Sequence, residues 1–357
     1  MLSVGIVGLP NVGKSTLFQA LTRKQVDCEN FPFCTIEPNV GVVEVPDPRL
    51  AVLAQWSKSA KVIPAAIEFV DIAGLVKGAH KGEGLGNKFL SRIREVDAIC
   101  HVVRAFEDPN VVHVDGSVDP LRDAEVIEIE LAMADMATVA RRKERLQGKL
   151  KSGRSKELDM EEALLERVSK HLDQGKPARE LEYTEDEGAV MRELSLLTYK
   201  PMMYVVNVAE EEVANEDWVS PLGSGKIAIP LSVKVEQELL DLDESERQEF
   251  MAAIGLQEAG LDRVIRAGFV LLNLITFLTT GEKETRAWPI SRGTKGPQAA
   301  GTIHTDFEKG YIRAEVIPYE VFAQRGELGA REDGKLRVEG KEYVVEDGDV
   351  VHFRVSV

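Results

Sequence analysis

Short apolar segments alternate with longer amphipathic segments over much of the first two-thirds of the chain. Each short run is apolar enough for a strand that is buried on both faces, as in a parallel sheet. The alternation predicts an α/β fold, in which a mostly parallel sheet carries helices on both faces. We expect its strands at residues 2–7, 41–45, 66–70, 98–103, 202–206 and 226–231.

Between about residues 118 and 199 the pattern changes to a charged stretch that is rich in Glu, Arg, Lys, Leu and Ala and has few glycines. No strand signal interrupts it, so we expect an antiparallel helical hairpin inserted into the first domain at about 120–200. The sequence Ser152-Gly153-Arg154-Ser155 is the predicted turn of this hairpin.

The pattern changes again after a helical stretch that we expect to run to about Ile275. Short strand-like runs separated by glycine turns then predict a small mixed or antiparallel sheet domain. These runs are Thr285–Ile290, Gly301–Ile303, Arg313–Ile317 and Val350–Val355. We therefore divide the chain into a first domain at 1–277, interrupted by the hairpin, and a second at 278–357.

The 357 residues, 44% of them hydrophobic, are enough for two or three domains with real cores. No apolar run approaches the roughly 20 residues of a membrane span, and no basic segment precedes the first strand. We therefore expect a cytoplasmic protein that does not enter a membrane. Cys28, Cys34 and Cys100 form no C-x-x-C pair, which suits a reducing compartment. Cys28 and Cys34 are interpreted either as ordinary small residues or as redox-sensitive thiols.

The net charge of −16 argues against a nucleic-acid partner, because two polyanions repel each other. The segment from Arg141 to Lys156 is an exception, since Glu144 is its one acidic residue among many basic ones. Such a run is either a solvated helix face or, if it projects from the body, a contact surface for RNA.

One motif identifies a ligand. Residues Gly8-Leu9-Pro10-Asn11-Val12-Gly13-Lys14-Ser15 fit G-x-x-x-x-G-K-[ST], the phosphate-binding loop of nucleotide hydrolases. The motif follows a predicted strand and precedes a predicted helix, as this loop requires. We expect the backbone N–H groups of the loop and Lys14 to surround the phosphates of a nucleoside triphosphate. The hydroxyl of Ser15 is then the natural ligand of Mg²⁺.

Asp71-Ile72-Ala73-Gly74 follows the strand expected at 66–70, which places a carboxylate where it can hold Mg²⁺ through a water. The Gly74 N–H is expected to sense the γ-phosphate. Thr35 lies between the first helix and the next strand, and its hydroxyl is expected to complete the Mg²⁺ shell.

The glycine-rich segment after Asp71 reads as a flexible switch loop or, alternatively, as a plain surface loop. Leu75 stands where the familiar signalling GTPases have a glutamine that orients water. Intrinsic hydrolysis should therefore be slow, unless another group holds the water. His113 is one candidate for this group and His80 another, and an ordinary loop histidine is the alternative for both.

The base-reading segment differs from that of a GTPase. GTPases read guanine with N-K-x-D after a strand, whereas this chain has Asn207-Val208-Ala209-Glu210. Glutamate is one methylene longer than aspartate and does not reproduce its paired contact with guanine, so adenine is the better prediction. Asn207 is expected to pair with the amine and a ring nitrogen of adenine. Ser232 lies where backbone N–H groups commonly help to hold the base.

Together these motifs resemble the YchF subfamily of Obg-related proteins, the Obg-like ATPases. The resemblance rests on residues 8–16, 30–39, 71–79 and 207–210 and extends over essentially the whole chain, including the hairpin. It implies a C-terminal TGS domain, a ubiquitin-like β-grasp module. It also implies Mg²⁺-dependent hydrolysis of ATP in preference to GTP, and association with the ribosome or its large subunit. By this resemblance the residues from Asn11 through Val12 and Gly13 to Thr16 bind the phosphates, Ser15 and Thr35 the metal, and Asn207 to Glu210 the adenine.

The leading hypothesis is thus a regulatory ATPase, expected to be a monomer, whose arm and C-terminal domain report nucleotide state to a ribosomal partner. One alternative is a GTPase with a degenerate base site. The other is an RNA- or ribosome-binding protein in which the nucleotide is a structural ligand with negligible turnover.

Overall fold

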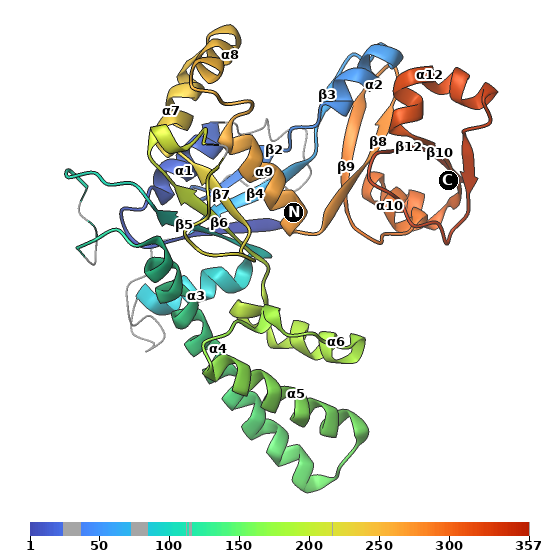
Figure 1. The fold of residues 1–357 in the computed structure, drawn as a ribbon. Coiled ribbons are helices and arrows are strands. Elements are labelled where there is room, and N and C mark those ends of the chain that lie inside the picture. Colours follow the sequence, from blue (N-terminus) through green and yellow to red (C-terminus); the bar gives the residue numbers. More distant parts are fainter. Residues whose placement is uncertain (24–36, 73–84, 112, 114–115, 216, 357) are drawn as a thin grey trace.

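The computed structural model describes residues 1–23, 37–72, 85–111, 113, 116–215 and 217–356. Within these residues the chain builds two six-stranded sheets and a helical arm. Figure 1 shows the arm below the first sheet and the second sheet to its right. The expected α/β architecture is confirmed.

The first sheet has the strand order β2-β4-β1-β5-β6-β7. All neighbouring pairs in it are parallel except β2 and β4. The strands predicted for this region are confirmed, with small shifts at their ends. They are β1 (Ser3–Val7), β2 (Val40–Glu44), β4 (Ala66–Asp71), β5 (Ala98–Arg104), β6 (Met202–Asn207) and β7 (Ala228–Leu231). Because β1, β5, β6 and β7 are parallel, the loops that follow them meet at one edge of the sheet.

Helices cover both faces of this sheet (Figure 1). Helices α1 (Lys14–Arg23) and α9 (Gly260–Leu271) pack on one face, and α3 (Leu85–Glu95) and α4 (Pro120–Ser152) lie on the other. Strand β5 is buried along its whole length, as expected for a central strand with helices on both sides. Helices α7 (Val233–Asp241) and α8 (Glu244–Ala253) follow β7.

The arm consists of the distal part of α4 together with α5 (Lys156–Asp173) and α6 (Glu185–Leu194). Helix α4 ends at Ser152 and α5 begins at Lys156, so the turn lies where the sequence predicts it. The Ser155 side chain caps α5 by accepting a hydrogen bond from the Leu158 N–H. The arm has a core of its own, built from apolar side chains of all three helices.

The second sheet has the order β11-β10-β12-β8-β9-β3. Its C-terminal strands are β8 (Leu274–Thr280), β9 (Thr285–Ser291), β10 (Tyr311–Pro318), β11 (Arg337–Glu339) and β12 (Asp349–Val355), and its helices are α10 (Gly296–Ile303), α11 (Thr305–Lys309) and α12 (Tyr319–Glu332). The first and last of these strands, β8 and β12, lie side by side and parallel. This arrangement agrees with the predicted β-grasp module.

Two local predictions in this region are wrong. Gly301–Ile303 is the end of α10, not a strand, because Gly296-Pro297 starts a helix in which Ala299 and Ala300 pack inward. The helix expected to reach Ile275 ends at Leu271, and β8 begins at Leu274. The β-branched and aromatic residues of β8 favour a strand there. The division into domains at 277/278 stays a prediction.

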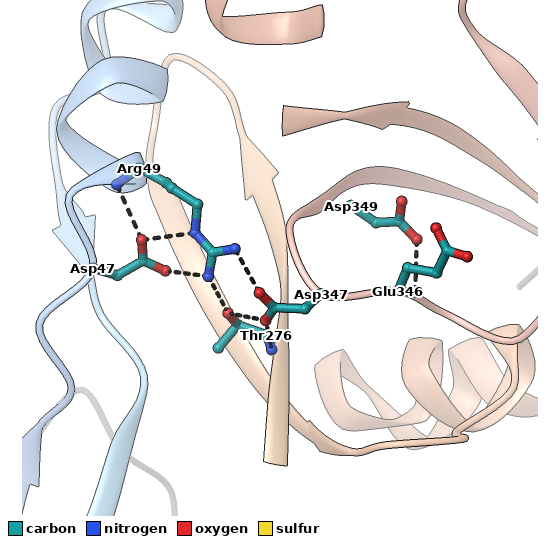
Figure 2. Close-up of polar contacts among 6 residues, drawn as sticks. All are labelled: Asp47, Arg49, Thr276, Glu346, Asp347 and Asp349. Atoms are coloured by element: carbon teal, nitrogen blue, oxygen red, sulfur yellow. Dashed lines mark hydrogen bonds and ion pairs between the residues drawn. The ribbon is translucent and has the colours of Figure 1, made fainter. Parts of the chain in front are cut away.

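A segment from the first half of the chain packs on the second sheet. Helix α2 (Arg49–Ser57) contacts β8, β9 and α12, and β3 (Val62–Ile63) pairs with the edge of β9. The Arg49 guanidinium lies between Asp47, Asp347 and the Thr276 hydroxyl (Figure 2). Residues on both sides of the predicted boundary therefore hold the second sheet to the first.

Candidate nucleotide-binding site

The phosphate loop follows β1 and has the backbone geometry that its sequence suggests. Asn11 and Gly13 have positive φ angles, 63° and 96°. A side chain at Gly13 would place its Cβ 2.5 Å from the Asn207 Nδ2, and one at Gly8 would lie 2.7 Å from the Val102 carbonyl oxygen. Both glycines of the motif are thus required by the close approach of neighbouring strands and loops.

The predicted metal and phosphate ligands Lys14, Ser15 and Asp71 lie at the start of α1, which follows β1, and at the end of the adjacent strand β4. The Lys14 Nζ is 3.2 Å from the Asp71 Oδ1, and both side chains are largely buried. Ser15 is exposed in the first turn of α1, after the buried Lys14. A hydroxyl and a carboxylate are oxygen donors of the kind that Mg²⁺ prefers, so these residues fit the expected ion. No group of three or more His, Cys, Asp or Glu side chains suited to a metal occurs among the described residues.

A cavity of 480 Å³ opens next to the phosphate loop. It is lined by residues from the loops that follow β1, β5, β6 and β7 and from the start of α7. Most of the residues predicted to bind the nucleotide line it, namely Asn11, Gly13, Thr16, Asn207, Val208, Glu210 and Ser232. The sheet topology therefore brings together residues that lie about two hundred positions apart in the chain.

Asn207 lines the cavity and also makes two hydrogen bonds within the protein. Its Nδ2 donates a hydrogen bond to the Val12 carbonyl oxygen at 3.0 Å, and its Oδ1 accepts one from the Val233 N–H at 3.2 Å. Asn207 is only 4% exposed. Its amide therefore ties the phosphate loop to the loop after β7. Pairing of Asn207 with adenine stays a prediction.

The carboxylate of Glu210 is also engaged. It forms an ion pair with the Lys234 ammonium at the edge of the cavity, and this contact raises the pKa of Lys234 above its usual value. Glu210 and Lys234 come from the loop after β6 and the first turn of α7. A guanine-reading carboxylate would have to accept hydrogen bonds from the base instead.

One wall of the cavity is formed by residues that the sequence did not indicate as nucleotide-binding. Phe106, Glu107, Asp108 and Val111 line it from the loop after β5. The signal was present, because this loop follows a predicted parallel strand that neighbours the phosphate-loop strand. The segment carries no known nucleotide motif, and so only His113 was singled out there.

His113 does not line this cavity. Its Nε2 lies 2.7 Å from the Asp123 Oδ2 in the first turn of α4, and both side chains are buried. The other oxygen of Asp123 lies 3.2 Å from the Arg122 Nη2. A role for His113 in positioning water stays a prediction.

Family models match both parts of the chain. The model described as "50S ribosome-binding GTPase" matches residues 3–145. The model YchF-GTPase_C, described as a protein of unknown function (DUF933), matches residues 274–356.

Curated relatives match the chain from end to end. The "Ribosome-binding ATPase YchF" of Bacillus subtilis is 52% identical over 365 residues and covers 100% of both chains. The protein of the same name in Escherichia coli O157:H7 is 53% identical, covering 99% of each. The chain belongs to the YchF family.

Two further comparisons extend this result. The human "Obg-like ATPase 1" is 46% identical and covers 99% of this chain and 92% of its own. The solved structure of the Schizosaccharomyces pombe YchF GTPase superposes with a TM-score of 0.87 at 40% identity, covering 99% of this chain and 97% of that one. The arm and the second sheet therefore belong to the shared YchF architecture.

Several predicted site residues of this YchF-family chain lie outside the described residues. They are Thr35, Gly74, Leu75 and His80, together with Cys28 and Cys34. Cys100 is buried in β5, and burial raises the pKa of its thiol to about 12. No described helix is long and apolar enough to cross a membrane.

Proposed function

We propose that this chain binds ATP with Mg²⁺ in the cavity and hydrolyses it to ADP and phosphate, as a nucleotide-dependent switch that binds the ribosome or its large subunit. The observation that carries the proposal is the continuity of the phosphate loop with the 480 Å³ cavity, since both share Asn11, Gly13 and Thr16. The names of relatives more than 50% identical over the whole chain support the same activity.

In this proposal, residues Asn11 to Thr16 surround the phosphates, and Lys14 adds positive charge. Ser15 and Thr35, together with Asp71 through a water, would hold Mg²⁺, and the bound ion would supply positive charge beside the phosphates. The ion pair of Lys14 with Asp71 supports this assignment, because the phosphate-binding lysine and the proposed metal-binding carboxylate lie next to each other. The Gly74 N–H, which lies outside the described residues, would sense the γ-phosphate.

Adenine is the proposed base because a glutamate paired with Lys234 stands where GTPases read guanine with an aspartate. The ion pair with Lys234 competes with any hydrogen bond that guanine would donate to Glu210. Val208 adds an apolar surface to the same wall. A GTPase remains the second candidate, since the matching family model and the yeast structure both carry that word in their descriptions.

Hydrolysis is proposed to be slow unless a partner assists, because Leu75 cannot orient water. His113 is the proposed water-positioning residue. Leu75 is also compatible with the alternative function, in which the protein uses the nucleotide only as a structural ligand and does not turn it over.

The arm is proposed to touch ribosomal RNA, but with fewer residues than its sequence suggests. Arg142, Lys143 and Arg154 form ion pairs with acidic residues of the arm. Arg141, Arg145 and Lys149 form no ion pair within the described part of the chain, and they are exposed at four-residue spacing on α4. That spacing places them along one face of the helix, so they form the RNA-facing stripe of this proposal. We propose that the protein acts as a monomer in the cytoplasm, where ribosomes translate.

One experiment tests the ATPase proposal. Unlabelled ATP and GTP compete against one labelled nucleotide, and phosphate release is then measured with and without ribosomes. We expect ATP to compete at least about tenfold better than GTP and ribosomes to raise the release rate. Stronger competition by GTP selects the GTPase, and background release under both conditions selects the binding protein.

A second experiment tests the RNA-facing stripe. Arg141, Arg145 and Lys149 are replaced together by Glu, and co-sedimentation with ribosomes is measured against salt concentration. The control replaces Lys170, Lys176 and Arg192, three exposed cations nearer the root of the arm, by Glu. We expect weaker binding and a shallower salt dependence for the first variant alone. Equal loss in both variants would mean that net charge, and not the stripe, determines binding.

A further inference from the structure

Arg104 is a buried cation that the proposed chemistry does not use. It is the last residue of β5, lies directly beside Asn207 of β6 in the sheet, and is 1% exposed. Burying a guanidinium is costly unless its N–H groups are hydrogen-bonded. Its recorded hydrogen-bond partners, within the described part of the chain, are all main-chain carbonyl oxygens of the loop that follows it.

Three hydrogen bonds fix the shape of that loop. The Arg104 Nε donates to the Phe106 carbonyl oxygen at 3.0 Å, Nη1 to that of Val111 at 2.9 Å, and Nη2 to that of Asp108 at 3.4 Å. The guanidinium carbon also lies 4.4 Å from the centre of the Phe106 ring. A planar fork of donors suits this task, because one side chain can reach carbonyl groups at three positions of the loop.

The residues that Arg104 holds are those that form the cavity wall. Phe106, Asp108 and Val111 line the cavity, whereas Arg104 does not. The Ala105 N–H donates to the Asn207 carbonyl oxygen at 2.8 Å, so the base of the loop is tied to the strand that carries the base-reading segment. Movement of this loop would therefore change the wall of the cavity.

We infer that Arg104 is a positioning residue for the nucleoside part of the bound nucleotide, acting through the wall formed by Phe106 to Val111. This inference rests on the proposed nucleotide site. The wall faces the same cavity as Val208 and Glu210, so it adds affinity for base and ribose. It does not add affinity for the phosphates, which the phosphate loop holds.

The test compares two ligands that share their phosphates. Dissociation constants are measured for ATP and for inorganic tripolyphosphate, both with Mg²⁺, using the full chain, Arg104→Met and Arg104→Lys. We expect Arg104→Met to weaken ATP binding about tenfold and to leave tripolyphosphate binding unchanged. Arg104→Lys should fall between, because it keeps the charge and loses the fork.

Phe106→Leu tests whether Arg104 acts through the wall. If it does, Phe106→Leu weakens ATP but not tripolyphosphate, and adding Arg104→Met to it causes little further loss. If Arg104→Met does not fold, the same two dissociation constants are compared for Phe106→Leu and Arg104→Lys. Arg337→Met is the control for general destabilisation, since Arg337 is bonded to Tyr343 and Asp349 in the second sheet.

Two results would overturn the inference. One is an equal loss of ATP and tripolyphosphate affinity in the Arg104 variants, and the other is unchanged ATP affinity. Failure of the proposed site itself looks different, because the unaltered chain would then bind ATP no more tightly than tripolyphosphate.

Discussion

Two junctions attach the arm and the second sheet to the first sheet, and they are built around opposite charges. At the arm junction the Glu128 carboxylate on α4 accepts hydrogen bonds from the Tyr204 hydroxyl, from Lys226 at 3.2 Å and from Arg179 at 3.4 Å. At the second-sheet junction the Arg49 guanidinium donates to two carboxylates and a hydroxyl, with four hydrogen bonds of 2.8 Å (Figure 2).

The two junctions also differ in their place relative to the nucleotide site. Tyr204 lies on β6, whose end carries Asn207 and the base-side wall. Asp47 follows β2, which runs antiparallel, so it lies at the opposite end of the sheet from the phosphate loop. The arm is therefore joined to a strand that carries the site, and the second sheet is joined away from it.

The arm junction should be the more costly one to break. Replacing Glu128 by Gln leaves Lys226 and Arg179, both mostly buried, without their carboxylate. Loss of one partner of a buried pair costs about 3 kcal/mol. Urea unfolding measures this loss. The control is Glu193→Gln, which removes an exposed partner of Arg142 on the same arm and should cost about 0–1 kcal/mol. Equal costs would show that burial does not distinguish the two pairs.

The second-sheet junction should lose less when its central residue is removed. After Arg49→Met, Asp347 can be hydrated, because its side chain is 45% exposed. Asp47 is only 8% exposed, but it keeps the hydrogen bond from the backbone N–H of residue 49. Loss of the charged hydrogen bonds should cost about 2 kcal/mol. Hydrogen exchange at Thr276 and urea unfolding measure the effect. Arg49→Lys is the matched variant and should lie between Arg49→Met and the unaltered chain. A larger loss than in Glu128→Gln would reverse the order of the two junctions.

Neither junction was predictable from the sequence, whereas the phosphate loop was. The loop is a local motif, and its glycines and strand-loop-helix context determine its backbone. Arg49 and Asp347 are separated by 298 positions, and no periodicity marks them as partners. The parallel sheet and the arm were predicted because hydrophobic patterning is also local.

The same limit explains the contacts of the site and the arm that the sequence does not predict. Asn207 was recognised as part of the base-reading segment, but its bonds to Val12 and Val233 depend on how three loops meet. The basic run from Arg141 to Lys156 was recognised as well. Its partial neutralisation by Glu161, Glu166 and Glu193 depends on the packing of α5 and α6 against α4.

Between pH 7 and pH 5 the arm junction should be the more acid-sensitive one, because His101 lies beside it. At the second-sheet junction, burial opposes ionisation of Asp347, but hydrogen bonds from Thr276 and Arg49 outweigh burial and lower its pKa, so that junction responds only at lower pH. The His101 ring is wholly buried, and its centre lies 5.3 Å from that of the Tyr204 ring. Burial lowers the pKa of His101 to about 3, and the charges of Glu128, Lys226 and Arg179 make smaller contributions to this pKa. In the unfolded chain a histidine binds a proton below pH 6.5, whereas folded His101 does not. Folding free energy is therefore lost as the pH falls from 6.5 towards 3, by about 2 kcal/mol at pH 5.

Urea unfolding at pH 7 and pH 5 measures this loss, and His101→Leu isolates it. The comparison with His101→Leu is necessary because Asp135 on α4 titrates with the opposite effect. Burial raises the pKa of Asp135, so protonation of Asp135 increases the stability of the fold as the pH falls. We expect the unaltered chain to lose about 2 kcal/mol more than His101→Leu over this range. The same loss in both proteins would mean that His101 is protonated in the folded state.

The smallest effect should be a gain at neutral pH. Both ring nitrogens of His101 are buried and have no hydrogen-bond partner among the described residues. A buried polar group without a partner costs roughly 1 kcal/mol or more, so replacing the ring by a leucine of similar size should stabilise the fold by about 1 kcal/mol at pH 7. His101→Asn is the matched variant, since it keeps a polar group at this position and should give no gain. A loss of stability in His101→Leu would show that the ring contributes packing against Tyr204 that outweighs its unpaired nitrogens, and the arm junction would then depend on that contact as well as on Glu128.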